Sequence, residues 1–237
     1  MKGMILAAGL GTRFKPWTDK HPKALAVING KSLLQRNVEY LQRAGITEVV
    51  VNVHHFADQI ESAIDDNSGW GSDIVISNES DLVLETGGGL MKARNLLADS
   101  SFVLMNVDIL TDMDLNTMIA MHEKLQPLAT IATSDRSTSR YFLFDHFGNL
   151  CGWTNTKSGE EKIVRETADR QKRAFSGIHV IDPTIFSLVK LSGKFSMVDL
   201  YLSLAGEEII KGFDHSETRF IDVGKPEAVA RAESMFL

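Results

Sequence analysis

The chain of 237 residues has a single cysteine and no apolar stretch long enough to cross a bilayer. One thiol excludes a disulfide framework and a cysteine-rich metal site, and it is typical of a reducing compartment. We expect Cys151, which lies among strand-like residues, to be a small half-buried side chain. No run approaches the roughly 18 apolar residues that a membrane span requires. We therefore expect a cytoplasmic protein with no membrane partner.

An excess of positive charge is also missing. Lysine and arginine total 25 against 31 aspartate and glutamate residues, so the net charge is −6. The chain thus has no global basic field that would attract nucleic acid, and we expect no such partner. Local arginines and lysines still suffice to bind a small anion. Hydrophobic content of 43% and charged content of 24% are ordinary for a globular protein.

The first half of the chain alternates strand-like and helix-like segments. An apolar run at 4–7 is too short for a signal peptide and is followed at once by Arg13 and Lys15, so it predicts a buried first strand. Helical spacing after Ser32, a good helix cap, ends at Gly45. Further strands are predicted at 48–53, 73–77 and 102–105, and further helices at 56–64 and 88–97. This order indicates a parallel sheet with helices on both faces.

The pattern changes after about Leu128. Strands are predicted at 128–133, 141–144, 150–153 and 174–181, followed by helices at 185–189, 197–204 and 226–235. No linker separates this part from the first half, so we interpret it as an extension of the same sheet. The expected fold class is α/β, a Rossmann-like three-layer α/β/α domain over 1–237 with a mostly parallel mixed sheet.

A glycine-rich loop follows the first predicted strand. Gly9 and Gly11 permit close backbone approach, and their amides are suited to an anion such as phosphate. A dinucleotide fingerprint would need glycine at position 14, which is Phe14, and the P-loop pattern is absent. Arg13 and Lys23 can neutralise the oxygens of a triphosphate. The two glycines alone are equally compatible with a plain turn, so the basic residues carry the interpretation.

The segment from Leu6 to Leu25 resembles the signature of the sugar-phosphate nucleotidyltransferases, and the resemblance extends over nearly the entire chain. Trp17 stands where that family usually has leucine, and Ala24 where it has proline. The sequence looks most similar to N-acetylmuramate-1-phosphate uridylyltransferases and to mannose-1-phosphate guanylyltransferase-like proteins. The resemblance implies a nucleotide-binding half at 1–127 and a sugar-binding half at 128–237.

A second glycine cluster, Gly87 to Gly89, precedes a predicted helix. Glycines allow the backbone to pack against a flat ring, and the helix N-terminus offers free amides, although a plain strand-to-helix turn has the same pattern. The resemblance places the base and ribose pocket here. The nucleotide-binding candidates are Leu6, Ala8, Gly9, Gly11, Thr12, Glu85, Thr86, Gly87, Gly88 and Asn106.

Two carboxylates are candidate ligands of Mg²⁺, which prefers oxygen donors and retains water or phosphate as co-ligands. Asp108 follows the apolar strand at 102–105, and Asp222 precedes the last predicted helix. Each aspartate taken alone is also a plausible helix or turn cap. The resemblance implies that both bind the metal, with Val107 replacing a usual glycine.

The sugar side of the site is less clear from the sequence. The resemblance places Ser176 and Gly177 in a strand beneath the sugar, with Glu166 as an acceptor for its hydroxyl hydrogens. Many relatives have a lysine after that glutamate which contacts the sugar phosphate, whereas this chain has Thr167. Arg140 and Lys162 are alternative phosphate contacts, each also typical of a solvated surface. His54 and His55 are adjacent on a strand and point to opposite faces, which argues against a metal pair.

The expected reaction is an in-line attack of a sugar 1-phosphate on the α-phosphorus of a nucleoside triphosphate. Asp108 and Asp222 would hold Mg²⁺, Arg13 would hold the departing pyrophosphate, and Lys23 would stabilise charge on the α-phosphate. The resemblance favours UTP with N-acetylmuramate 1-phosphate. The open alternatives are a mannose- or heptose-1-phosphate guanylyltransferase, an enzyme using an alcohol phosphate, and a non-catalytic sugar-nucleotide sensor.

The remaining expectations concern a further domain and the oligomeric state. Only one helix fits after Asp222, so we expect no second, β-helical enzyme domain of the kind that some relatives carry. The oligomeric state, including a homo-oligomer, stays open.

Overall fold

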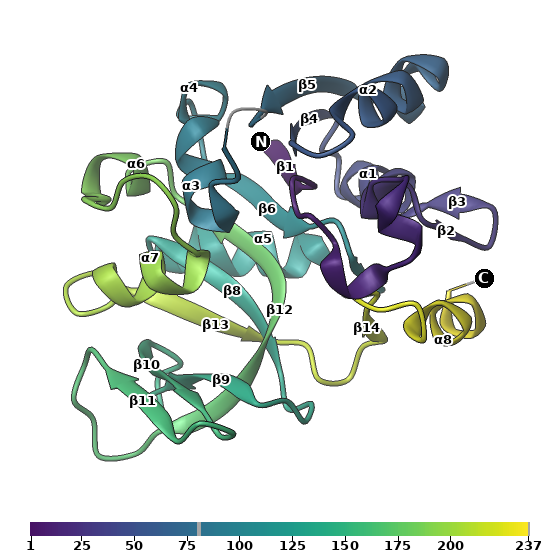
Figure 1. The fold of residues 1–237 in the computed structure, drawn as a ribbon. Helices are drawn as coiled ribbons and strands as arrows, with labels where there is room; N and C mark the ends of the chain where they lie inside the picture. Colours follow the sequence, from purple (N-terminus) through teal and green to yellow (C-terminus); the bar gives the residue numbers. More distant parts are fainter. Residues whose placement is uncertain (80–81, 237) are drawn as a thin grey trace.

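A computed structural model describes residues 1–79 and 82–236. The fold is built on a sheet of ten strands in the order β11-β10-β9-β12-β6-β1-β4-β5, with β8 paired to β12 and β13 paired to β8 (Figure 1). Strands of both halves of the chain therefore share one sheet.

The parallel part of the sheet comes from the first half of the chain. Its strands are β1 (Lys2–Leu6), β4 (Glu48–Val53), β5 (Asp73–Asn78) and β6 (Phe102–Asn106). β1 pairs with β4 on one side and with β6 on the other, and both pairings are parallel. The direction of strand addition reverses at β1, and such a reversal places a ligand crevice at the carboxyl ends of the strands.

The second half of the chain adds strands that are mostly antiparallel. The long β12 (Gln171–Ile181) runs antiparallel to β6, β8 and β9, and so joins the two halves. The other strands are β8 (Ala129–Ser134), β9 (Arg140–Phe144), β10 (Leu150–Asn155), β11 (Glu160–Ile163) and β13 (Ile210–Asp214). Two short ribbons stand apart from the sheet: β2 (Val27–Ile28) with β3 (Lys31–Ser32), and β7 (Ile109–Thr111) with β14 (Phe220–Asp222).

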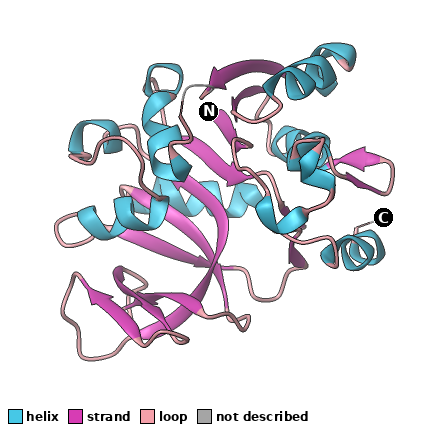
Figure 2. Ribbon diagram, viewed as in Figure 1, coloured by secondary structure: helices cyan, strands magenta, loops and turns pink. Residues whose placement is uncertain are grey.

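Helices cover both faces of the sheet (Figure 2). One face carries α1 (Leu33–Arg43), α2 (Ala57–Asp66), α5 (Leu115–Leu125) and α8 (Ala228–Met235). The other face carries α3 (Glu85–Lys92), α4 (Arg94–Leu97), α6 (Ile185–Leu188) and α7 (Met197–Leu204). Because strand side chains alternate, Ile5 packs with the first set and Met4 with the second.

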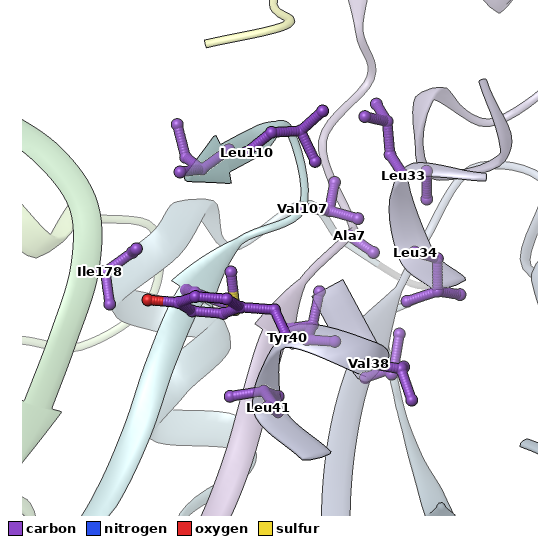
Figure 3. Packing of buried hydrophobic residues seen from close by; sticks show 14 of the residues in the cluster. Ala7, Leu33, Leu34, Val38, Tyr40, Leu41, Val107, Leu110 and Ile178 are labelled. Atoms are coloured by element: carbon purple, nitrogen blue, oxygen red, sulfur yellow. The ribbon is translucent and has the colours of Figure 1, made fainter. Parts of the chain in front are cut away.

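The core under α1 lies next to the crevice. Leu34, Val38 and Leu41 of α1 pack towards the sheet, while Val107 and Leu110 approach from the chain after β6 (Figure 3). This apolar contact fixes the backbone on which the candidate metal ligand Asp108 stands.

The three-layer α/β/α fold with a mixed sheet is confirmed, and most predicted elements are present within a few residues. Ser32 caps α1 as expected, since its hydroxyl accepts a hydrogen bond from the Gln35 amide at 3.0 Å. The helix predicted at 88–97 instead begins at Glu85 and is interrupted at Ala93. Helix α5 and both short ribbons had no sequence prediction.

The prediction of a half-buried Cys151 is wrong. Its side chain is fully buried in β10, and the thiol donates to the Leu143 carbonyl at 3.2 Å. The chain after β11 lies against this position, because the amides of Val164 and Arg165 donate to the Cys151 carbonyl at 2.9 and 3.2 Å, and this contact is not visible in the local sequence. Among the described residues, no helix is both long and apolar enough to cross a membrane.

A buried histidine gives a prediction about acid stability. His179 of β12 is 1% exposed and shares a hydrogen bond of 2.8 Å with the hydroxyl of Tyr201. Burial lowers the pKa of His179 to about 3, against about 6.5 in an unfolded chain. Between these values only the unfolded chain binds the proton. The free energy of unfolding therefore falls as pH drops below about 6.5, by up to ~1.4 kcal/mol per pH unit from this group.

Urea unfolding at pH 7, 6 and 5 tests this assignment. We expect His179→Gln to have a shallower pH dependence than the unmodified chain, whatever its absolute stability. Tyr201→Phe is the control, because it keeps the buried histidine and should keep the slope. Equal slopes for the unmodified chain and His179→Gln would contradict the prediction.

Candidate active site

The loop after β1 is shaped by one buried amide side chain. Asn52 at the end of β4 accepts hydrogen bonds from the backbone amides of Ala7 at 2.7 Å and Ala8 at 3.3 Å. Gly11 has a φ of +60°, and a Cβ there would come within 2.7 Å of the Thr18 methyl, so glycine is required on both counts. Gly9 faces open space, because a Cβ at this position would have no atom within 4 Å. The loop thus leaves room for a ligand over Gly9.

A cavity of about 190 Å³ opens beside this loop. It brings together eight of the predicted site residues, from β1, the start of α3 and the end of β6. These eight are Leu6, Ala8, Gly9, Lys23, Glu85, Thr86, Asn106 and Asp108. The sequence-based grouping of these segments is therefore reproduced in space, whereas the predicted residues Gly11, Thr12, Gly87 and Gly88 do not line this cavity.

Glu79 is a cavity residue for which we had no sequence prediction. Its side chain is fully buried and accepts hydrogen bonds from Asn52 Nδ2 at 2.6 Å and from the Leu84 amide at 3.2 Å. The carboxylate thereby links the loop after β1 to the start of α3. A single glutamate after a strand carries no recognisable signal. Asn52, in contrast, is detectable as the only polar side chain between the valines of β4.

The glycines of α3 contact the chain that precedes α7. The amides of Gly87 and Gly88 donate to the Phe195 carbonyl at 2.9 and 3.2 Å. A Cβ at Gly87 would lie 2.5 Å from the Phe195 ring, and one at Gly88 would lie 2.4 Å from the Gly193 carbonyl oxygen. These glycines therefore pack α3 against the chain before α7, and these two amides are already used.

The start of α3 is nevertheless unusual. Glu85 adopts a φ of +60°, which is uncommon for a residue with a side chain. Its carboxylate lies 3.5 Å from Lys194 Nζ. Because Glu85 and Thr86 line the cavity, the strained backbone lies at the ligand side of the helix.

Asp108 stands on a well-supported turn and pairs with Lys23. The Lys23 ammonium donates to Asp108 Oδ2, and both side chains are mostly buried. Asn37 of α1 donates to the Val107 carbonyl at 2.8 Å, and the Asp108 carbonyl accepts from the Val223 amide at 2.8 Å. The aspartate is thus held by the start and the end of the chain together.

Asp222 lies beside Asp108 because β14 pairs with β7, with Asp222 opposite Ile109. Its side chain is exposed where it lines a cavity, and the surrounding protein removes part of its hydration. This loss of hydration, together with the negative charge of Asp108, raises the pKa of Asp222, while Lys23 and Arg13 oppose the shift. Two carboxylates that repel one another in this way create a favourable position for a cation.

The carboxylate pair fits a hard divalent cation. Among the described residues, no three His, Cys, Asp or Glu side chains gather as a metal cluster. A cation here would therefore take its other ligands from water and substrate oxygens, which is how Mg²⁺ is commonly held. Asp108 and Asp222 are the residues that would hold it.

A second cavity, of about 860 Å³, lies on the other side of Asp222. Arg13 lines it together with Asp222, and a Cβ at Gly224 would lie 3.1 Å from Arg13 Nη2. Arg136, Ser134 and His215 also line it, and none of these three was predicted from the sequence. The acidic pair therefore adjoins both cavities.

The predicted sugar-side residues separate into two groups. Gly177, with a φ of +73°, lets β12 approach Asn106, because a Cβ there would lie 2.9 Å from Asn106 Nδ2. Ser176 is fully buried and hydrogen-bonds to His215 Nε2 at 2.7 Å. Glu166 points to solvent and pairs with Arg170 at 3.6 Å, and Arg140 is exposed at the start of β9. Neither Glu166 nor Arg140 lines the two cavities.

The histidines after β4 have separate surroundings. His54 Nδ1 lies 2.7 Å from the Glu79 carbonyl oxygen, whereas His55 is exposed and packs against the ring of Phe56. His54 thus supports the segment that carries Glu79.

A Rossmann-like fold with a glycine loop, a lysine and two paired carboxylates at the carboxyl ends of its strands defines a class of nucleotide-binding transferases. The sequence matches the model of the nucleotidyl transferase family over residues 2–234, so the chain belongs to that family. The predicted family resemblance is confirmed.

Two curated relatives align with nearly the whole chain. An N-acetylmuramate alpha-1-phosphate uridylyltransferase of Caulobacter vibrioides is 30% identical, over 98% of this chain and 95% of that protein. A UTP–glucose-1-phosphate uridylyltransferase of Synechocystis is 29% identical over 95% of this chain, which spans only 60% of the relative's length.

The fold is shared with solved structures. A putative glucose-1-phosphate thymidylyltransferase from Bacillus anthracis superposes with a TM-score of 0.84 at 16% identity, covering 99% of this chain and 94% of that one. At this identity the likeness concerns the fold.

The packing of α3 yields a stability prediction. In Gly88→Ala the new methyl group would press on the Gly193 backbone, so we expect the free energy of unfolding to fall by about 1–3 kcal/mol. Gly9→Ala is the matched control, since its methyl meets open space and should change stability by less than about 0.5 kcal/mol. Urea denaturation measures both. A Gly88→Ala variant as stable as Gly9→Ala would contradict the packing role.

Proposed function

We propose that the protein transfers a uridylyl group from UTP to N-acetylmuramate 1-phosphate or a related hexose 1-phosphate, giving a nucleotide sugar and pyrophosphate. The observation that carries this proposal is the convergence of Asp108, Asp222, Lys23 and Arg13 between two cavities. The smaller cavity, under the loop after β1, would take the nucleotide. The larger one would take the phosphate groups and the acceptor.

The chemistry requires no protein nucleophile, because a phosphate monoester is already anionic near neutral pH. Its oxygen attacks the α-phosphorus, a new P–O bond forms, and the bond to the pyrophosphate oxygen breaks. A bound Mg²⁺ supplies charge neutralisation for the phosphate oxygens. The residues supply position and charge: Lys23 stabilises the α-phosphate, Arg13 holds the departing pyrophosphate, and Asp108 with Asp222 holds the cation.

The choice of base and sugar is supported by likeness. The Caulobacter relative, of which this chain covers 95%, is by its name an N-acetylmuramate alpha-1-phosphate uridylyltransferase. The buried Glu79 lines the small cavity and would provide a hydrogen-bond acceptor for the base. The alternative substrates to compare with this pair are GTP with mannose 1-phosphate or heptose 1-phosphate.

A release assay tests the proposal. Purified protein is incubated with each of UTP, GTP, CTP, ATP and dTTP against a panel of sugar 1-phosphates, with and without Mg²⁺, and pyrophosphate is measured. We expect the highest release with UTP and N-acetylmuramate 1-phosphate, and release that depends on the metal. Binding of a nucleotide sugar without any pyrophosphate release would instead identify a sensor.

Substitution of the central charges gives a second prediction. Lys23→Ala and Asp222→Asn should each lower kcat by roughly 10²–10³, because each removes a preorganised charge at the reacting phosphate. Lys31→Ala is the control, since it also removes one lysine from an ion pair, with Glu39, but on the surface. Circular dichroism checks the fold. Near-normal kcat in either active-site variant would rule out the assigned role.

A further inference from the structure

Arg136 is a partly buried cation in addition to the Arg13 and Lys23 charges of the site. It follows β8 directly and lines the larger cavity with Arg13 and Asp222. One of its terminal nitrogens, Nη2, donates to the Phe175 carbonyl at 2.7 Å, and the guanidinium lies 5.1 Å from the centre of the Phe220 ring. Two contacts from different strands therefore fix the orientation of the guanidinium plane.

A second donor of Arg136 has no partner among the described residues. Its Nε is buried and has no hydrogen-bond partner within the described part of the chain. Of the ion pairs formed by the described residues, none includes Arg136. A guanidinium remains charged in proteins, and a partly buried one without a carboxylate is costly unless a ligand supplies the anion.

The electrostatics connect Arg136 with the acidic pair. Burial lowers the pKa of Arg136, and the charge of Asp222 acts in the opposite direction. In return, Arg136 is one of the cations that moderate the raised pKa of Asp222. Both side chains line the larger cavity, where a phosphate would meet the guanidinium and a cation held by the carboxylates.

Two other cations of the second half of the chain, Arg165 and Lys162, are engaged elsewhere. Arg165 donates to the Ala205 carbonyl at 3.0 and 3.1 Å and to the Glu208 carbonyl at 3.2 Å. Lys162 lies over the Trp153 ring and 3.4 Å from Glu160. Neither lines the larger cavity.

We propose that Arg136 binds the phosphate of the sugar 1-phosphate acceptor and holds it against the cation site of Asp108 and Asp222. This inference rests on the proposed function, because it assigns the acceptor side of the same site. A guanidinium suits this task because two parallel N–H donors match two phosphate oxygens.

Steady-state kinetics of Arg136→Gln test the proposal. With the best pair from the release assay, we expect the KM for the sugar 1-phosphate to rise about 10- to 100-fold, as for the loss of a charge-assisted hydrogen bond. The KM for the nucleoside triphosphate should change less than about twofold. Arg136→Lys keeps the charge without the paired donors and should cause a smaller rise.

Substitutions of two other arginines provide the control and the comparison for Arg136→Gln. Arg94→Gln removes the same charge from the exposed α4 and should leave both KM values unchanged. If Arg136→Gln raised the KM for the nucleotide by a larger factor than the KM for the acceptor, Arg136 would bind the triphosphate and the proposal would be overturned. A rise in acceptor KM in Arg140→Gln, but not in Arg136→Gln, would also overturn it.

A binding measurement separates this inference from the proposed function. If the unmodified chain releases no pyrophosphate with any pair, the proposed function fails. Thermal melting with added inorganic phosphate still tests Arg136 as an anion site. We expect phosphate to raise the melting temperature of the unmodified chain and of Arg94→Gln, but not of Arg136→Gln. Equal shifts in all three would overturn the assignment of Arg136.

Discussion

The pairing of β14 with β7 is the constraint on which the candidate site depends. It places Asp222 opposite Ile109, and the Val223 amide donates to the Asp108 carbonyl. Two carboxylates more than a hundred residues apart are thereby held together despite their mutual repulsion. The backbone hydrogen bonds of the ribbon and the apolar packing of Leu110 and Ile221 offset that repulsion. A bound cation would remove it.

Two buried asparagine side chains hold the backbone at the site in place by hydrogen bonds. Asn52 holds the loop after β1 by accepting from two backbone amides, and Asn37 holds the turn before Asp108 by donating to the Val107 carbonyl. Both side chains are almost fully buried, so their hydrogen bonds are shielded from competing water. A buried polar residue in β4 and another in α1 thus position the backbone on either side of the cavity.

The glycines show how one sequence pattern can serve two purposes. Gly9 faces open space where a ligand would lie, whereas Gly87 and Gly88 let α3 contact the chain before α7. The first role is a matter of ligand access and the second of helix packing. The local sequence could not distinguish the two roles. The contact of Gly88 is the Gly193 carbonyl, which lies about a hundred residues further along the chain, and no sequence pattern links the two positions.

The sequence by itself determined the parallel first half, the loop with Lys23, and the candidate residues Asp108 and Asp222, because hydrophobic periodicity and turn chemistry are local properties. It also determined the family, through the residues of that loop. Only the tertiary structure decided that Glu79 and Arg136 line the cavities, that Glu166 and Arg140 lie outside them, and that Cys151 is fully buried. The physical reason is that burial and charge environment arise from contacts between distant segments, here β8, β12 and β14, which no local pattern records.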